Sequence, residues 1–185
     1  MPAPLLSKEE VIDRIVGVFR QKGYDGASLA DLSAATGLGR SSLYHYFPGG
    51  KQDMALAAID QVGQWVEQNI VQPLDGDGTP AERLARMLAA IDRLYAGGEE
   101  ACLLGTLVLS GGLPLFQESL RRAFLTWIAA LAKLLVEAGQ APEMAHARAE
   151  DAVLRIHGAL VLAGGLGDPT PFRRVLARLQ AELLA

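Results

Sequence analysis

One short segment of the chain collects side chains suited to binding nucleic acid: Arg40, Ser41, Ser42, Tyr44 and His45. A guanidinium can grip a guanine edge through two parallel hydrogen bonds, while hydroxyls and an imidazole suit phosphate oxygens and base edges. Leu43 and Phe47 are four residues apart and share one face of a helix, so we expect them to be buried. The spacing therefore predicts a helix from about Arg40 to Phe47 whose outward face is polar.

A second short helix is predicted directly upstream, with Ser28 as its N-cap. Asp31, three residues later, forms a capping-box-like pair with Ser28. Gly37 can adopt the left-handed conformation that ends a helix, and Gly39 allows a sharp turn into the next one. Two short helices joined by a glycine turn, the second of them polar, are typical of a DNA-binding helix-turn-helix.

Two more residues complete the predicted DNA contacts. Tyr46 ends the polar segment, with packing inside the protein as the equal alternative. Lys51 opens the next helix, where a cation and free backbone amides suit a phosphate. For His45 the alternative is a surface side chain without a role. The predicted DNA-binding residues are Ser28, Arg40, Ser41, Ser42, Tyr44, His45, Tyr46 and Lys51.

This stretch resembles the DNA-binding domain of the TetR/AcrR family of bacterial transcriptional repressors. The resemblance rests on Gly23-Tyr24, Ser28, Ala34 to Gly37, the run from Leu43 to Phe47, and Lys51. The chain departs from the family's commonest pattern in Pro48-Gly49-Gly50, which is one residue longer than usual. This Pro-Gly-Gly-Lys variant and the segment from Gly167 to Arg174 are similar to a branch with flavonoid-responsive and multidrug-type regulators. The resemblance implies repression that a ligand releases.

Composition limits the class of protein. The chain has 185 residues and is 50% hydrophobic, which is enough for a real core. Its apolar runs fall short of a membrane span of about 20 residues, so we expect a soluble protein with no membrane partner. The start at Met1 lacks the sections of a signal peptide, and the single cysteine, Cys102, fits a reducing cytoplasm. Three scattered histidines and one cysteine predict neither a metal nor another cofactor.

The net charge of −4 is unevenly distributed along the chain. Up to Lys51, six basic side chains stand against five acidic ones, whereas the remainder carries eleven basic and sixteen acidic side chains. Acidity is thus concentrated beyond residue 51, outside the predicted DNA-binding part of the chain, which we call the reading head. We expect moderate affinity for each head, so that binding needs two heads on one double-stranded operator and depends strongly on salt.

Helical periodicity throughout predicts an all-helical protein of about nine helices. We place a helix-turn-helix DNA-binding domain at residues 1–51 and a helical effector-binding and dimerisation domain at 52–185. A continuous helix between the two domains would transmit movement of the effector-binding domain to the DNA-binding domain. The segment from Pro73 to Thr79 is predicted as a loop. Other helices are expected at about Ser7–Lys22, Lys51–Val71, Pro80–Tyr95, Ala101–Ser110, Pro114–Ala138, Pro142–Gly164 and Pro169–Leu184.

Aromatic, sulfur and polar side chains between Trp65 and His157 could line a pocket for a flat, mostly apolar effector. Ordinary core packing is the alternative at every position, because aromatic residues and methionine usually just fill space. Cys102 has no neighbouring cation in sequence, which favours a buried, inert thiol over a redox sensor. The predicted pocket residues are Trp65, Met87, Tyr95, Cys102, Thr106, Phe116, Phe124, Trp127 and His157.

The last two predicted helices each carry an apolar face, and small residues such as Gly158 would let another helix approach closely. These features predict a homodimer in which the helices pair as a four-helix bundle, with burial inside one protomer as the alternative. The predicted interface residues are Leu154, Gly158, Val161, Leu162, Phe172, Val175, Leu176 and Leu179.

Three functions compete at this point. The favoured one is a ligand-responsive repressor that binds a palindromic operator as a homodimer and is released by a small, mostly apolar effector. An enzyme is disfavoured, because no histidine lies in a nucleophile elbow, metal pair or phosphate loop. A helical protein-interaction adaptor without DNA binding is the alternative, and it leaves the polar face of the second short helix unexplained.

Overall fold

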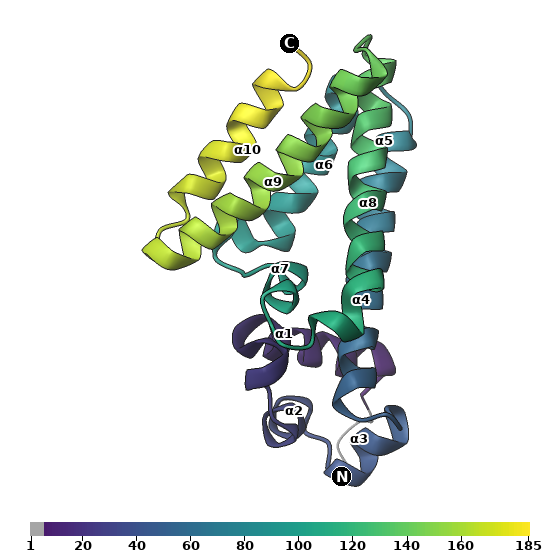
Figure 1. Cartoon of the computed structure of the whole chain (residues 1–185), viewed down its shortest axis with the longest axis vertical. Helices are drawn as coiled ribbons and strands as arrows, with labels where there is room; N and C mark the ends of the chain where they lie inside the picture. Colours follow the sequence, from purple (N-terminus) through teal and green to yellow (C-terminus); the bar gives the residue numbers. More distant parts are fainter. Residues whose placement is uncertain (1–5) are drawn as a thin grey trace. The chain divides into compact units, whose positions relative to one another are not determined.

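The computed structural model describes residues 6–185, and every regular element among them is helical (Figure 1). The chain forms two compact units: residues up to 62 with 103–120, and residues 63–102 with 121–185. The first unit thus takes in a later segment that the predicted boundary between residues 51 and 52 assigned to the second domain. The prediction that the start of the chain lacks the sections of a signal peptide concerns a segment that begins at Met1. Residues 1–5 of that segment lie outside the described residues. No helix among residues 6–185 is both long and apolar enough to cross a membrane.

The first unit is built on α1 (Lys8–Gly26), α2 (Leu29–Thr36), α3 (Arg40–Tyr46), most of α4 (Lys51–Val66), α7 (Leu103–Val108) and the start of α8 (Leu113–Glu137). Ser7 caps α1 in a reciprocal capping box with Glu10. Gly23, where the sequence predicted the end of this helix, has a left-handed backbone with φ of 66°, and a last turn follows it.

The core of the first unit forms where α1 packs against α2 and α7. Ile15, Phe19, Leu32 and Leu43 are fully buried in it, and for Leu43 this confirms the burial that its spacing predicted. Tyr24 stacks on Phe19 with ring centroids 6.2 Å apart, so its ring packs within this unit. This core fixes α2 and α3 against a rigid support.

The long helix after the reading head is longer than predicted. It runs from α4 through a π-helical segment, η1 (Glu67–Val71), into α5 (Gln72–Asp75), so the helix reaches past Pro73 and the predicted loop is wrong at its start. Proline at 73 lacks the N–H that an α-helix requires, and a widened π-turn just before it relieves that conflict. The Asn69 side chain donates to the Trp65 carbonyl at 3.0 Å within this region. The loop proper begins at Gly76.

The second unit contains η1, α5, α6 (Pro80–Leu94), the short 3₁₀ turn η2 (Ala96–Gly98), most of α8, α9 (Pro142–Leu166) and α10 (Thr170–Glu182). Thr79 caps α6 in a capping box with Glu82. Helix α10 packs on α9 and α6, and Met87, Ile91 and Phe172 are fully buried in this unit. With α4, η1 and α5 counted as one run, residues 6–185 form nine helices and one 3₁₀ turn, close to the prediction.

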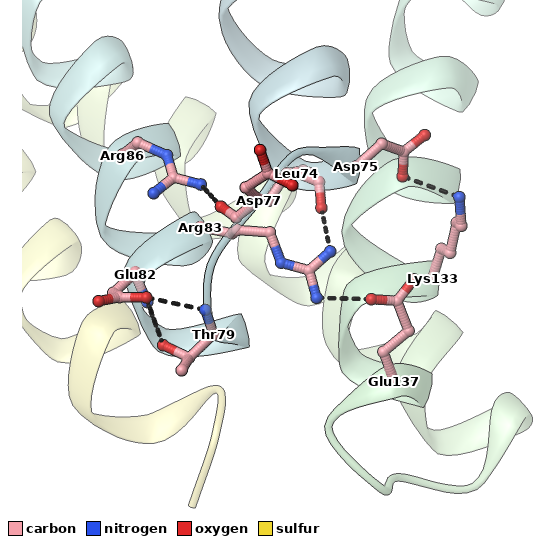
Figure 2. Close-up of polar contacts among 9 residues, drawn as sticks. All are labelled: Leu74, Asp75, Asp77, Thr79, Glu82, Arg83, Arg86, Lys133 and Glu137. Atoms are coloured by element: carbon pink, nitrogen blue, oxygen red, sulfur yellow. Dashed lines mark hydrogen bonds and ion pairs between the residues drawn. The ribbon is translucent and has the colours of Figure 1, made fainter.

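A buried arginine fastens α5 to α6 and α8 in the second unit (Figure 2). Arg83 donates to the Leu74 carbonyl at 2.8 Å and pairs with the Glu137 carboxylate at 2.6 Å. Nearby, Lys133 and Asp75 form an ion pair at 2.9 Å, but both side chains are well exposed. The Arg83 guanidinium therefore holds the end of α5 through a buried hydrogen bond, although its partner Glu137 is 39% exposed.

Candidate nucleic-acid interface

The first helix of the predicted helix-turn-helix begins with a complete capping box. Ser28 Oγ accepts from the Asp31 amide at 3.1 Å, and Asp31 Oδ2 accepts from the Ser28 amide at 2.9 Å. Lys22 of α1 also donates to Asp31. The hydrogen bond from Lys22, followed by those from Ser28, lowers the pKa of the Asp31 carboxyl well below its usual range. Asp31 therefore stays charged, and the α2 cap is formed, at neutral pH.

The turn between α2 and α3 is held by hydrogen bonds on both sides of Gly37. This glycine has a left-handed backbone with φ of 72°, and its N–H donates to the Ser33 carbonyl at 2.9 Å. The buried Thr36 hydroxyl donates to the Leu32 carbonyl at 2.7 Å and accepts from the Leu38 amide at 3.3 Å. The geometry between the two short helices is consequently well fixed.

Sequence reasoning missed two residues that support this turn, Arg14 and Thr36. The Arg14 guanidinium reaches from α1 to the carbonyls of Ala35 and Thr36, at 3.4 and 3.3 Å, where α2 ends with free acceptors. A threonine on the last turn of a helix, directly before a glycine, was a local signal for the cap. Nothing local pointed to Arg14, because its partners lie more than twenty residues away.

Helix α3 divides its side chains as its spacing predicted. Leu43 is fully buried and Phe47 nearly so, whereas the polar residues at 40, 41, 42, 44 and 45 are exposed. Tyr46 is half-buried, with its ring 6.3 Å from that of Phe47 and 6.0 Å from that of His45. Its position fits both readings that the sequence left open. The outer face of α3 thus presents one guanidinium, two hydroxyls, a phenol and an imidazole.

Lys51 opens α4 as predicted, but its ammonium is turned toward α1. It donates to the carbonyls of Tyr24 and Ala27 at 2.9 and 3.1 Å and lies 4.5 Å above the Tyr24 ring. These carbonyls belong to the end of α1 and the residue that caps it, where a cation is favourable. In this structure Lys51 joins α1 to α4, and its predicted contact with a phosphate stays a prediction.

Replacing Lys51 with methionine should therefore cost stability. The variant keeps the length of the stem but loses two charge-assisted hydrogen bonds and a cation–π contact, so we expect the free energy of unfolding to fall by about 2 kcal/mol. Urea denaturation followed by circular dichroism measures the change. Lys8→Met, at an exposed lysine of α1, is the matched control and should change stability by less than about 0.5 kcal/mol. Equal stabilities for the two variants would contradict the structural role.

Residues 11–58 match the family model for bacterial regulatory proteins of the tetR family, and residues 80–178, more than half of the chain, match the C-terminal domain of LmrA/YxaF-like transcriptional regulators. The chain belongs to the TetR family. It is a helix-turn-helix transcriptional regulator that binds DNA, and the family is not a family of enzymes. The alternative function given in the sequence analysis, a protein-interaction adaptor that does not bind DNA, is therefore wrong.

Individual relatives of this TetR-family regulator agree with the assignment. An uncharacterised HTH-type regulator, YxaF of Bacillus subtilis, is 28% identical over 169 residues, covering 89% of this chain and 88% of its own. A TetR regulator from Legionella pneumophila superposes with a TM-score of 0.84 at 21% identity, covering 98% of both chains. The regulator CifR, solved with a 26-bp double-strand operator DNA, has a TM-score of 0.74 at 20% identity over 98% of this chain and 99% of its own. These two structures show the same fold.

The predicted pocket residues of this TetR-family regulator fall into two sets. Tyr95, Cys102, Phe124, Trp127 and His157 gather in the second unit through contacts between their side chains. Met87 is fully buried in the core of that unit, and Trp65 is half-buried on α4.

The other set lies in the first unit. Phe116 packs its edge on Tyr24 with centroids 5.0 Å apart, and the Thr106 methyl group lies beside Gly23. Core packing accounts for both side chains within that unit, as the alternative reading allowed.

The residues of the predicted dimer interface differ in their exposure. Phe172 and Leu179 are fully buried and Leu176 is nearly so, because α10 packs on α9 and α6 of the same protomer. These three residues follow the alternative of burial inside one protomer, and Val175 is half-buried. On α9, by contrast, Leu154, Val161, Leu162 and Leu166 are 66, 68, 50 and 62% exposed.

Proposed function

We propose that this regulator binds a palindromic operator as a homodimer and that a small, mostly apolar effector bound in its second unit releases it. The observation that carries the DNA-reading part is the exposed polar face of α3 over a buried Leu43. The capping box of α2 and the tight turn at Gly37 hold that face in one orientation, which is what reading a major groove requires. CifR, a protein of the same fold, is known in complex with operator DNA, which supports operator DNA as the partner of this head.

Arg40 is the residue to which we assign base reading. It is exposed at the first position of α3, where a positive charge opposes the helix dipole by about 0.3–1 kcal/mol. Its position is thus not explained by helix stability. Meanwhile Arg14, Lys22 and Lys51 are engaged inside the unit. Arg40 therefore carries a large share of the positive charge that this head presents to DNA.

The homodimer part rests on the apolar stripe of α9, formed by Leu154, Val161, Leu162 and Leu166. From residue 158 to residue 167 this helix and its cap contain no titratable side chain. A Cβ added at Gly158, Gly164 or Gly165 would meet nothing within 4 Å, so the backbone there is open to a neighbouring helix. Large apolar side chains left half exposed in a row are typical of a protein interface, and two-fold pairing would present two heads to one operator. With operator DNA as its partner, the protein is proposed to act in the cytoplasm.

The Arg40→Ala variant tests the reading head. An operator is first selected from random duplex DNA with the purified protein at two salt concentrations, and enrichment of a palindrome is expected. Affinity for that operator should then fall in Arg40→Ala by about 1–3 kcal/mol, or roughly 5- to 150-fold, while affinity for random DNA changes much less. Fluorescence anisotropy with labelled duplexes measures both.

Failure of this assignment has a clear signature. Equal losses on operator and random DNA would reduce Arg40 to a phosphate contact. Ser42→Ala, on the same exposed face, is a matched control that removes a hydroxyl but no charge and should leave the salt dependence unchanged. If no palindrome is enriched at low salt, the dimeric operator complex itself is overturned.

A further inference from the structure

Cys102, the single cysteine of the chain, lies in the second unit between two groups that can handle protons. The Tyr95 hydroxyl donates a hydrogen bond to Cys102 Sγ at 3.4 Å. His157 of α9 lies beside the sulfur: burial alone would lower the pKa of this imidazole, but its interactions with Cys102 and the Val153 carbonyl outweigh burial, so the pKa is raised. A titratable imidazole that the sequence did not place near the thiol is thus supplied by a helix more than fifty residues away.

The hydrogen bonds of His157 define which of its nitrogens can take a proton. Nδ1 lies 2.8 Å from the Val153 carbonyl oxygen, which can only accept, so Nδ1 carries a hydrogen. The Nε2 atom is buried and has no partner at ordinary hydrogen-bond distance among residues 6–185, while the Cys102 side chain interacts with the same ring. In the neutral imidazole Nε2 is therefore the basic nitrogen. A thiol that gives its proton to this base becomes a thiolate stabilised by the imidazolium and by the Tyr95 hydroxyl.

The surroundings of this pair are aromatic and contain an unsatisfied donor. The rings of Phe124 and Trp127 lie 5.2 and 5.5 Å from the His157 ring. Trp127 is 3% exposed, and its indole Nε1–H has no acceptor among residues 6–185. A buried donor without an acceptor costs about 1–3 kcal/mol, which a bound oxygen atom would recover. Through the His157 ring, the cluster thus connects a nucleophile, a base and an unsatisfied donor among aromatic side chains.

We propose that Cys102 is a covalent sensor site for small, apolar α,β-unsaturated carbonyl compounds. The carbonyl oxygen of the compound accepts from Trp127 Nε1, and the Cys102 thiolate attacks the β-carbon. A C–S bond forms, the electron pair of the C=C bond moves to the enolate, and the proton held by His157 is returned to the α-carbon. The net change is addition of S–H across the double bond, with no oxidant and no leaving group.

The adduct would form whether or not the protein regulates a gene, but its consequence rests on the proposed function. An adduct in this cluster fills space between α8 and α9, the helices that contribute Trp127 and His157, within the second unit. We expect the modified protein to bind the operator less tightly than the unmodified protein.

The test compares the native full-length chain with the same chain unfolded in urea, where Cys102 is an ordinary thiol. Both are treated with 2-cyclohexen-1-one at pH 7, and adduct formation is followed by intact-protein mass spectrometry. We expect a single addition, absent in Cys102→Ser, that forms about ten times faster in the native protein because more of its thiol is ionised. A native rate below the unfolded rate would overturn the proposal and leave Cys102 as a buried, inert thiol.

Variants of the residues beside Cys102 distinguish activation of the thiol from an effect of packing alone. Tyr95→Phe and His157→Gln should lower the native rate toward that of the unfolded chain while circular dichroism stays unchanged. His146→Gln, at an exposed histidine of the same helix as His157, is the matched control and should react like the original protein. If neither Tyr95→Phe nor His157→Gln changes the rate, the assigned roles are wrong.

Operator binding is then measured by anisotropy for the unmodified and modified protein. A loss of affinity on modification, absent in Cys102→Ser, is expected, whereas unchanged affinity would overturn the sensing role. Failure of the unmodified protein to bind any operator would instead count against the proposed function and would leave the mass-spectrometric result intact.

Discussion

Val161→Glu should convert the protein to monomers and reduce its affinity for the operator by about 10²- to 10⁴-fold. Val161 lies in the middle of the α9 stripe and is 68% exposed within the protomer, so a glutamate there is solvated in the monomer and the fold is retained. In a dimer the same carboxylate would be buried against an apolar partner helix without a counter-ion, which is strongly unfavourable. Loss of pairing also removes the gain from binding two half-sites at once.

Size-exclusion chromatography with light scattering gives the oligomeric state, and anisotropy gives the operator affinity. Leu125→Glu is the matched control, because it places the same charge at a leucine of α8 that is 43% exposed and lies outside the α9 stripe. A Val161→Glu protein that remains dimeric with its original affinity would show that the interface lies elsewhere.

The second large effect is expected for stability, with Arg83→Met. The Arg83 side chain is 9% exposed and holds both the Leu74 carbonyl and the Glu137 carboxylate (Figure 2). Methionine keeps most of the apolar stem but leaves a buried carbonyl without its donor. Glu137 is 39% exposed, so its carboxylate is solvated by water once Arg83 is gone, and the main cost is that of the unsatisfied buried carbonyl, about 1–3 kcal/mol. We expect the free energy of unfolding to fall by about that amount.

The chain supplies its own control for this prediction. Lys133 and Asp75 pair at 2.9 Å beside the Arg83 cluster, but their side chains are 58 and 42% exposed. Surface pairs contribute about 0–1 kcal/mol, so Lys133→Met should have a small effect in the same urea titration. If the two variants lose equal stability, burial is not what gives the Arg83 pair its strength.

The reading head could be predicted from sequence because its signals are local. The capping box at Ser28, the glycine turn at Gly37 and the spacing of Leu43 and Phe47 each lie within a few residues of what they determine. The π-helical segment before Pro73 could not be predicted in the same way. A proline usually marks the end of a helix, and whether a widened turn can accommodate it depends on packing along the whole helix.

Faces and partners were harder to assign than helices. Leu176 and Leu179 have the same spacing and chemistry as residues of an interface, yet they are buried inside the protomer, while Val161 and Leu162 of α9 are left exposed. An apolar stripe in the sequence predicts that the face is buried, but not whether the same protomer or a partner buries it. Similarly, Lys51 was placed correctly at the start of α4, but the acceptors that hold its ammonium come from the end of α1.

By itself, the sequence of this protein determined its helical class, the helix-turn-helix and the outward face of α3, because caps, turns and periodicity act over one or two turns of helix. Only the tertiary structure decided which cations are engaged, which apolar faces are already covered, and that Cys102, Tyr95 and His157 meet. Such contacts join residues far apart in the chain, and no local preference of the backbone encodes them.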